Sequence, residues 1–433
     1  MLKYLNGDKN NFEKELDFIL NQRRVQNSNK SSLVKKIVFD IKKNKDVALL
    51  KYEKKFSNLK KIKLSNLKFS EKEIKNILKK LDKKTKKSID LAFDRIFLFH
   101  KNQKIKNYKI KDKYNNLMSY ISTPIEKIGI YVPGGTASYP SSVLMNCIPA
   151  IIAGVPEIYM TTPCINKNYN PAVLYAAKKC KVKEIYKVGG AQAIASLAFG
   201  TKIIKKVNKI VGPGNEYVAL AKKEVFGSVG IDMMAGPSEV TVVADKTSRP
   251  DWIASDLIAQ AEHDNFAQSI LITNDKKTIS NVNYYLRKQL KQLKKKKIAS
   301  FSLKKFGLAI FAKNKKNLIK IINNIAPEHL EIVTSKPEKI LQNIKNAGSI
   351  FIGEYSPEAM GDYIAGTNHV LPTSGSAKFA SGLSVYDFLK RHSIIKISKT
   401  GIERLGPSVI NLAEYENLDG HANSVKIRLT GKK

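Results

Sequence analysis

The 433-residue chain is poor in several features, and each shortage narrows what the protein can be. Its three cysteines, Cys147, Cys164 and Cys180, have spacings that suit neither a disulfide framework nor a cysteine-based zinc site. The longest mostly apolar run, residues 143–155, is shorter than the roughly 20 residues that span a bilayer. The first eight residues also lack the apolar segment of a signal peptide. We therefore expect a soluble, cytoplasmic protein without a membrane segment.

Arginine is scarce although positive charge is abundant. Lysine and arginine total 76 against 37 acidic residues, a net charge of +39, yet only eight of the 76 are arginines. Residues 124–270 carry 15 basic and 12 acidic side chains and residues 350–430 carry eight of each, so the excess lies elsewhere. Because nucleic-acid readers rely on the arginine fork, we interpret the excess as lysines on solvated helix faces. We predict no specific nucleic-acid partner; a basic nucleic-acid-binding module is the alternative.

The hydrophobic pattern changes at about residue 116. Residues 11–115 have helical spacing, whereas later segments alternate between short β-rich runs and helical stretches, which is typical of parallel sheets. The expected strands of a first series are residues 127–132, 157–161, 184–188, 209–211 and 239–244. Those of a second series are residues 269–273, 307–312, 330–334 and 348–352.

The two series predict an α/β protein with four regions. We expect a helical N-terminal region, residues 1–123, that packs on the second α/β unit. A first α/β domain follows over residues 124–238, a second over 239–380, and a small α-rich tail over 381–433. Ligands usually bind outside the carboxyl ends of such strands, so we expect a cleft there.

Three glycine-rich turns each follow a predicted strand and precede a helix, at residues 130–136, 188–192 and 211–215. Glycine lets a ligand approach the backbone closely, and a helix N-terminus favours an anion such as a dinucleotide phosphate. None completes the G-x-G-x-x-G pattern, so ordinary strand-to-helix turns are the alternative. Three such turns in one domain favour a nucleotide cleft.

Metal-ligand candidates begin with Gln260 and His263, which share a helix face because they lie three residues apart. An imidazole with amide or carboxylate oxygens suits zinc, although a solvated helix end is the alternative unless further ligands converge. Further candidates are Asp362, His369 and the cluster of Glu416, Asp419 and His421.

The neighbouring pair Glu328 and His329 precedes a predicted strand and offers an acid and a base to one cleft. Histidine is the natural general base near neutral pH, and a carboxylate beside it can orient it or activate water. An exposed Glu–His pair without function is the alternative. A zinc hydrolase using Glu328 to activate water also fits these residues, but it leaves the glycine-rich turns unused.

Taken together, these motifs resemble the histidinol dehydrogenase family over most of the chain, least in the first hundred-odd residues. The stretches that carry the resemblance are residues 231–239, 253–263, 327–329, 361–363, 366–369 and 419–421, together with the glycine-rich turns. The family converts L-histidinol through L-histidinal to L-histidine with NAD and one zinc ion per subunit. The resemblance thus implies an NAD-dependent oxidoreductase of histidine biosynthesis with two Rossmann-like, aldehyde-dehydrogenase-like domains.

The resemblance also implies a role for individual residues and a homodimer with shared active sites. It implies a catalytic pair, Glu328 and His329, with His329 as general base and Glu328 activating water. It implies zinc ligands at Gln260, His263, Asp362 and His421, with His421 supplied by the other subunit. It implies NAD contacts at Tyr131, Gln192 and Asn215. It implies substrate contacts at Ser238, Gln260, His263, His329, Asp362, His369, Glu416 and His421, of which Glu416 also comes from the partner.

Overall fold

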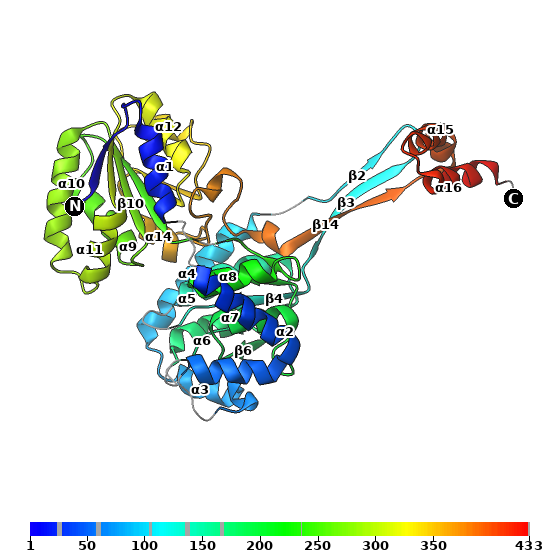
Figure 1. Cartoon of the computed structure of the whole chain (residues 1–433), viewed down its shortest axis with the longest axis horizontal. Helices are drawn as coiled ribbons and strands as arrows, with labels where there is room; N and C mark the ends of the chain where they lie inside the picture. Colours follow the sequence, from blue (N-terminus) through cyan, green and yellow to red (C-terminus); the bar gives the residue numbers. More distant parts are fainter. Residues whose placement is uncertain are drawn as a thin grey trace. The chain divides into compact units, whose positions relative to one another are not determined.

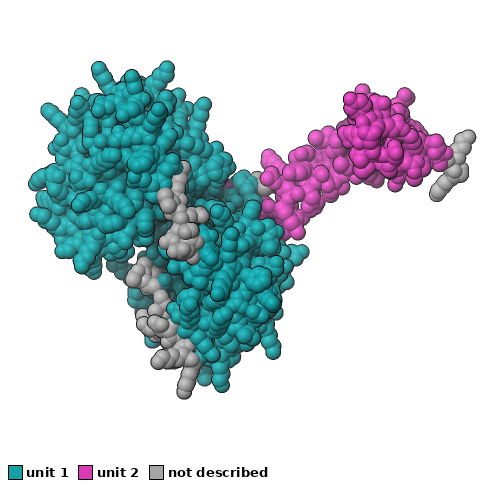
Figure 2. All heavy atoms as spheres, in the orientation of Figure 1, with its two compact units in different colours: residues 1–102, 126–387 teal, residues 103–125, 388–433 magenta. Residues whose placement is uncertain are grey.

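The computed structural model describes residues 1–23, 28–57, 62–103, 106–134, 139–164, 169–234 and 236–431. Contacts divide the chain into a larger unit, residues 1–102 with 126–387, and a smaller unit, residues 103–125 with 388–433 (Figure 2). The larger unit contains two parallel sheets, and the smaller unit contains an antiparallel sheet (Figure 1).

The first parallel sheet has five strands. In spatial order they are β6 (Glu184–Tyr186), β5 (Glu157–Thr161), β4 (Lys127–Tyr131), β7 (Lys209–Val211) and β8 (Gly230–Ile231). All neighbours are parallel, so the carboxyl ends share one edge. The direction of winding reverses between β4 and β7, the kind of switch point at which doubly wound sheets bind ligands. The predicted glycine-rich turns leave this edge after β4, β6 and β7.

Helices from two parts of the chain cover this sheet. They are α2 (Ser28–Phe56), α3 (Glu71–Leu78) and α4 (Lys83–Lys101) from the N-terminal region, and α5 (Pro140–Ala153), α6 (Pro171–Lys179), α7 (Gly190–Phe199) and α8 (Glu216–Val225) from the sheet's own connections. Helix α2 packs on α7 and α8, α3 on α6, and α4 on α5 and α6. The prediction that the N-terminal region packs on the second α/β unit is therefore wrong for α2 to α4. The physical reason for α2 is its apolar stripe, in which Val34 and Ile41 join the core around Ile194 and Val218.

The second parallel sheet has six strands. In spatial order they are β1 (Lys3–Asn6), β11 (Leu308–Phe311), β10 (Gln268–Thr273), β9 (Glu239–Ala244), β12 (His329–Ile332) and β13 (Ser349–Ile352). The central strands β9 and β10 are buried along their whole length, as expected when helices cover both faces. The α/β fold class with two parallel sheets is confirmed. Strand β1 corrects the prediction that residues 1–123 are helical, because residues 3–6 pair in parallel with β11.

The helices of the second sheet begin and end at recognisable signals. They are α1 (Phe12–Gln22), α9 (Pro250–Ala261), α10 (Lys276–Leu290), α11 (Lys296–Phe306), α12 (Lys315–Ile325), α13 (Glu338–Leu341) and α14 (Glu358–Tyr363). Proline occupies the first turn of α9, where its missing N–H costs nothing. Side chains of Asp275 and Asn314 cap the first N–H groups of α10 and α12. Helix α12 ends at Ala326, whose φ of 50° turns the chain into the segment that carries Glu328 and His329.

The smaller unit is a three-stranded sheet followed by two helices. These elements are β2 (Tyr108–Lys111), β3 (Leu117–Pro124), β14 (Leu389–Lys396), α15 (Lys399–Tyr415) and α16 (Asp419–Thr430), with spatial strand order β14-β3-β2. The two helices agree with an α-rich tail, although β14 also pairs with β3 along its whole length. One expectation needs correction: the end of the region predicted to be helical forms β2. Strands β2 and β14 are largely exposed, so their sequences lack the alternation of apolar and polar residues that predicts a half-buried strand.

The three cysteines are buried, and they form no disulfide within the described ranges. Across the described ranges, no helix is long and apolar enough to cross a membrane.

Candidate active site

The candidate catalytic pair lies at the amino ends of strands. His329 is the first residue of β12 and is in register with Val240 of the neighbouring β9. Glu328 directly precedes it, and both side chains are buried, with 4% of each residue exposed. This agrees with the sequence, in which Glu328 and His329 precede a predicted strand. The glycine-rich turns of the first sheet, by contrast, follow the carboxyl ends of strands, where ligands usually bind.

One residue, Glu239, holds both members of the pair through its main chain. Its N–H donates a hydrogen bond of 2.8 Å to Oε2 of Glu328, and its carbonyl lies 3.1 Å from Nδ1 of His329. Since a carbonyl only accepts, Nδ1 carries a proton, and Nε2 is the ring nitrogen that can exchange a second proton. Nε2 is buried, and no residue in the described ranges forms a hydrogen bond with it; the nearest carboxylate oxygen is Oδ1 of Asp362, at 3.7 Å. The arrangement therefore directs Nε2 toward Asp362 and places the imidazole beside the acid Glu328.

Burial and charge shift the pKa values of this cluster. Burial raises the pKa of Glu328 to about 7 and that of Glu358 to about 8. Burial opposes the charged form of His329, but the carboxylates of Glu358, Glu328 and Asp362 outweigh it and raise the pKa of His329 well above its ordinary value. These carboxylates thus stabilise the imidazolium that forms when His329 accepts a proton.

Glu358 is a member of the cluster that the sequence reasoning missed. It is 3% exposed, and its Oε1 lies 3.6 Å from Nδ1 of His329. Ligand atoms of His329, Glu358 and Asp362 all lie within 4.8 Å of one another. The available signal was spacing, since Glu358 and Asp362 are four residues apart and share a face of the short helix α14.

Gln260 and His263 come from the end of α9. Gln260 is fully buried, and neither its Oε1 nor its Nε2 forms a hydrogen bond with any residue in the described ranges. An amide buried without partners costs free energy, so this oxygen fits a ligand for a cation better than a packing role. His263 lies in the turn after α9 and is exposed, and the charge of Asp362 acts on its imidazole. Amide, imidazole and carboxylate donors of this kind suit zinc.

His369 fixes the segment that carries Asp362. Its Nδ1 donates a hydrogen bond of 2.9 Å to the carbonyl of Asp362, and its Nε2 lies 3.4 Å from Oγ of Ser142 on α5. Burial lowers the pKa of His369, which favours the neutral ring. His369 therefore connects α14 beside the second sheet to a helix of the first.

Ser238 belongs to the segment that leads into β9. It is half-buried and directly precedes Glu239, and its carbonyl accepts a hydrogen bond of 3.0 Å from the N–H of Gln268. This candidate substrate contact and the main chain that holds the catalytic pair are therefore adjacent residues.

The three NAD candidates lie at the carboxyl edge of the first sheet. Tyr131 ends β4, and its hydroxyl accepts a hydrogen bond of 3.1 Å from the N–H of Gly190 at the start of α7. Gln192 is buried and donates from Nε2 to Oε1 of Glu53 on α2, at 2.8 Å. Asn215 is exposed and caps α8. The N-termini of α7 and α8 thus face the switch point, which fits a dinucleotide phosphate.

Two predicted residues belong to the smaller unit. Glu416 follows α15, and His421 lies in the first turn of α16. Both side chains are exposed within that unit.

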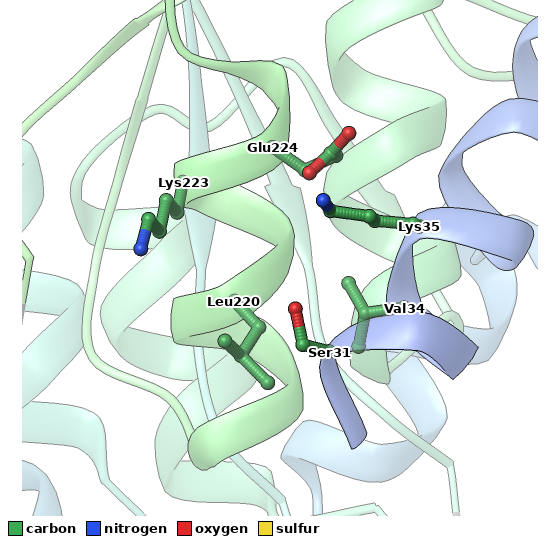
Figure 3. A pocket seen from close by; sticks show the side chains of 6 residues that line it. All are labelled: Ser31, Val34, Lys35, Leu220, Lys223 and Glu224. Carbon is green, nitrogen blue, oxygen red and sulfur yellow. The ribbon is translucent and has the colours of Figure 1, made fainter. Parts of the chain in front are cut away.

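A pocket of roughly 230 Å³ lies elsewhere, between α2 and α8 (Figure 3). Its lining residues are Ser31, Val34, Lys35, Leu220, Lys223 and Glu224. None of them belongs to the predicted site, so this pocket is separate from the candidate active site.

Comparisons with known proteins identify the family of this chain. The family model described as histidinol dehydrogenase matches residues 20–429. The chain is 55% identical to a histidinol dehydrogenase of Pelagibacter ubique over 433 residues, which is all of both chains. It is 48% identical to that of Brucella suis, covering 96% of this chain and 97% of the relative. The crystal structure of histidinol dehydrogenase from Elizabethkingia anophelis matches with a TM-score of 0.92 and 39% identity, covering 99% and 98% of the two chains.

Family match, near-complete coverage and structural similarity lead to one conclusion. The chain is an enzyme, an oxidoreductase, and it belongs to the histidinol dehydrogenase family.

Proposed function

We propose that this enzyme carries out the NAD-dependent, four-electron oxidation of L-histidinol through L-histidinal to L-histidine. The observation that carries the proposal is the buried imidazole of His329, whose Nδ1 is held by the carbonyl of Glu239, beside the buried Glu328. In the first oxidation, Nε2 of His329 takes the hydroxyl proton of the alcohol as the carbon–hydrogen bond breaks. The carboxylates around His329 favour this transfer because they stabilise the imidazolium product.

The aldehyde must add water before the second oxidation. Glu328 is placed to take a proton from that water, because its Oε2 is held by the N–H of Glu239 and its side chain is adjacent to His329. His329 then removes a proton from the resulting hydrate, as it did from the alcohol. Each half of the reaction releases one hydride and the carbon ends as a carboxylate.

We propose that Gln260, His263 and Asp362 hold a zinc ion together with His421 of a second chain in a homodimer. The two unpaired buried atoms of Gln260 support this donor set. Tyr131, Gln192 and Asn215 would line the NAD site, and Ser238, His369 and Glu416 would contact the substrate. When bound, zinc orients the substrate nitrogens and NAD accepts the hydride.

The test of the function is NADH formation on addition of L-histidinol and NAD, with and without a chelator. We expect two NADH for each histidinol consumed and loss of activity with the chelator. Absence of histidinol-dependent NADH formation by the zinc-loaded protein would refute the proposal.

Variants test the roles of the pair. His329→Ala and Glu328→Gln should fold normally, as judged by circular dichroism, and lose about 10²- to 10⁴-fold in kcat. Glu338→Gln, an exposed acid on α13, is the matched control and should retain full activity. Full activity of His329→Ala would exclude it as the base.

The shared site can be tested by complementation. His263→Ala and His421→Ala should each be inactive as homodimers. Mixed dimers should regain activity if each site combines residues from two chains, because one of the two sites is then intact. No recovery in verified heterodimers would argue against the shared site.

A further inference from the structure

Arg23 is a buried arginine whose donors all have partners. It follows α1 in the sequence, and only 2% of its side chain is exposed. Its Nε donates to the carbonyl of Phe266 at 2.9 Å, and its Nη1 donates to Oε2 of Glu239 at 2.8 Å and to Oε1 of Gln268 at 2.7 Å. Its Nη2 donates to the carbonyls that precede Glu239, those of residues 237 and 238, at 2.8 and 3.2 Å. All five N–H donors of the guanidinium are therefore engaged.

Glu239 is the residue through which Arg23 reaches the catalytic pair. Its main-chain N–H and carbonyl hold Glu328 and His329, whereas its side chain is held by Arg23 and by the N–H of Ser374, at 3.0 Å to Oε1. The main chain of Glu239 thus positions Glu328 and His329, and Arg23 positions the side chain of Glu239.

We propose that Arg23 is a positioning residue for the catalytic pair and for Ser238, acting through Glu239 and the main chain before it. This inference rests on the proposed function, because it assumes that Glu328 and His329 perform the chemistry. Arg23 contacts neither of them, and no contact with a reacting atom is required.

The strand itself does not depend on Arg23, which separates a positioning role from a purely structural one. From Val240 onward, β9 is paired with β10 on one side and with β12 on the other. Glu239 is the first residue of the strand, and its N–H and carbonyl serve Glu328 and His329. Glu239 is 3% exposed, and without Arg23 its carboxylate would keep one hydrogen-bond donor in the described ranges, the N–H of Ser374. A buried carboxylate without its cation is unfavourable, so we expect Glu239 to shift.

A shift of this kind affects the rate more than binding. A displacement of about 1 Å at the reacting groups can cost on the order of 10²-fold in rate. Lysine at position 23 would keep the charge beside Glu239, but it could not reproduce the guanidinium geometry that also donates to three carbonyls. We therefore expect Arg23→Lys to fold and yet to be impaired.

The experiment compares Arg23→Ala, Arg23→Lys and the control Arg287→Met, an exposed arginine on α10. For Arg23→Ala we expect kcat to fall about 10²-fold while KM for NAD stays within twofold of wild type. Added guanidinium at tens of millimolar should restore part of the kcat of Arg23→Ala, but none of that of His329→Ala. Arg287→Met should match wild type with and without guanidinium.

Two results would overturn the inference: a kcat for folded Arg23→Ala within threefold of wild type, or a loss of kcat that guanidinium does not restore. If Arg23→Ala does not fold, Arg23→Lys decides: a lowered kcat with an unchanged melting temperature supports positioning, and an unchanged kcat refutes it. An inactive wild type would instead refute the proposed function, so the two failures are distinguishable.

Discussion

Lys222→Met removes one partner of a buried ion pair that connects two segments of the first sheet. Lys222 on α8 donates from Nζ to Oδ1 of Asp232 at 2.5 Å and to the carbonyl of Gly212 at 2.7 Å. Asp232 also accepts from the N–H groups of Gly212 and Met233, at 2.8 and 2.7 Å. The side chains of Lys222 and Asp232 are 4% and 1% exposed. The pair thus joins the glycine-rich turn after β7 to the segment that leads toward Ser238.

The magnitude follows from what the substitution leaves behind. Removing one partner of a buried pair costs about 3–5 kcal/mol, because the other charge remains buried. Asp232 keeps two N–H donors, so we expect a value near the lower limit, about 3 kcal/mol. In the double variant Lys222→Met/Asp232→Asn no charge is left, and the amide oxygen still accepts from one of the two N–H groups. Its loss of stability should therefore be smaller than the sum of the two single losses.

The assay is urea unfolding followed by circular dichroism, combined with KM for NAD at a temperature where all variants are folded. We expect an earlier unfolding midpoint and a raised KM for Lys222→Met, since the turn at Gly212 borders the proposed NAD site. Lys320→Met, which breaks the exposed pair with Glu13, is the control and should change neither. A loss below 1 kcal/mol for Lys222→Met, or strict additivity in the double variant, would refute the reasoning.

Three further predictions concern the turn, the pH dependence and the metal. Gly212→Ala should lower the melting temperature and raise KM for NAD more than Gly227→Ala does. Both glycines have positive φ, but a Cβ at position 212 would lie 2.2 Å from a main-chain carbonyl oxygen, whereas a Cβ at position 227 would meet nothing within 4 Å. Equal effects of the two substitutions would contradict this reasoning. Burial raises the pKa of Glu53 above its ordinary 4.5, so the protonated carboxyl stabilises the fold at low pH and this stability is lost as the pH rises through the pKa of the folded state. The urea midpoint of Glu53→Gln relative to that of wild type should therefore be higher at pH 8 than at pH 5. A difference that does not change with pH would count against this reasoning. Gln260→Ala should bind zinc at least about tenfold more weakly, as measured by metal analysis after dialysis. Gln342→Ala, which changes an exposed glutamine, is the control and should keep its zinc. Equal zinc contents in the two variants would exclude the amide of Gln260 as a ligand.

The hydrophobic pattern of the sequence was sufficient to predict the strands that are covered by helices on both faces of the sheet. The run 239–244 is predicted and observed as β9, because a strand buried on both faces is rich in apolar residues, here Val240, Val242, Val243 and Ala244. Strands β2 and β14 are exposed and lack that signal, so only their pairing with β3 defines them.

Contacts between residues distant in sequence decided the rest of the candidate site. Arg23 and Glu239 are 216 residues apart, and nothing near either residue in the sequence indicates that they form a buried pair. Glu358 likewise enters the cluster only because β12 and α14 lie side by side.

By itself, the sequence determined the α/β class, the turns after β4, β6 and β7, and the residue types able to bind a metal or move a proton. These properties depend on local periodicity and on the chemistry of single side chains. Only the tertiary structure decided that Glu358 and Asp362 join the catalytic pair, and that the main chain of Glu239 holds it. The physical reason is that burial and hydrogen-bond partners arise from packing, which brings together segments that the local pattern treats as independent.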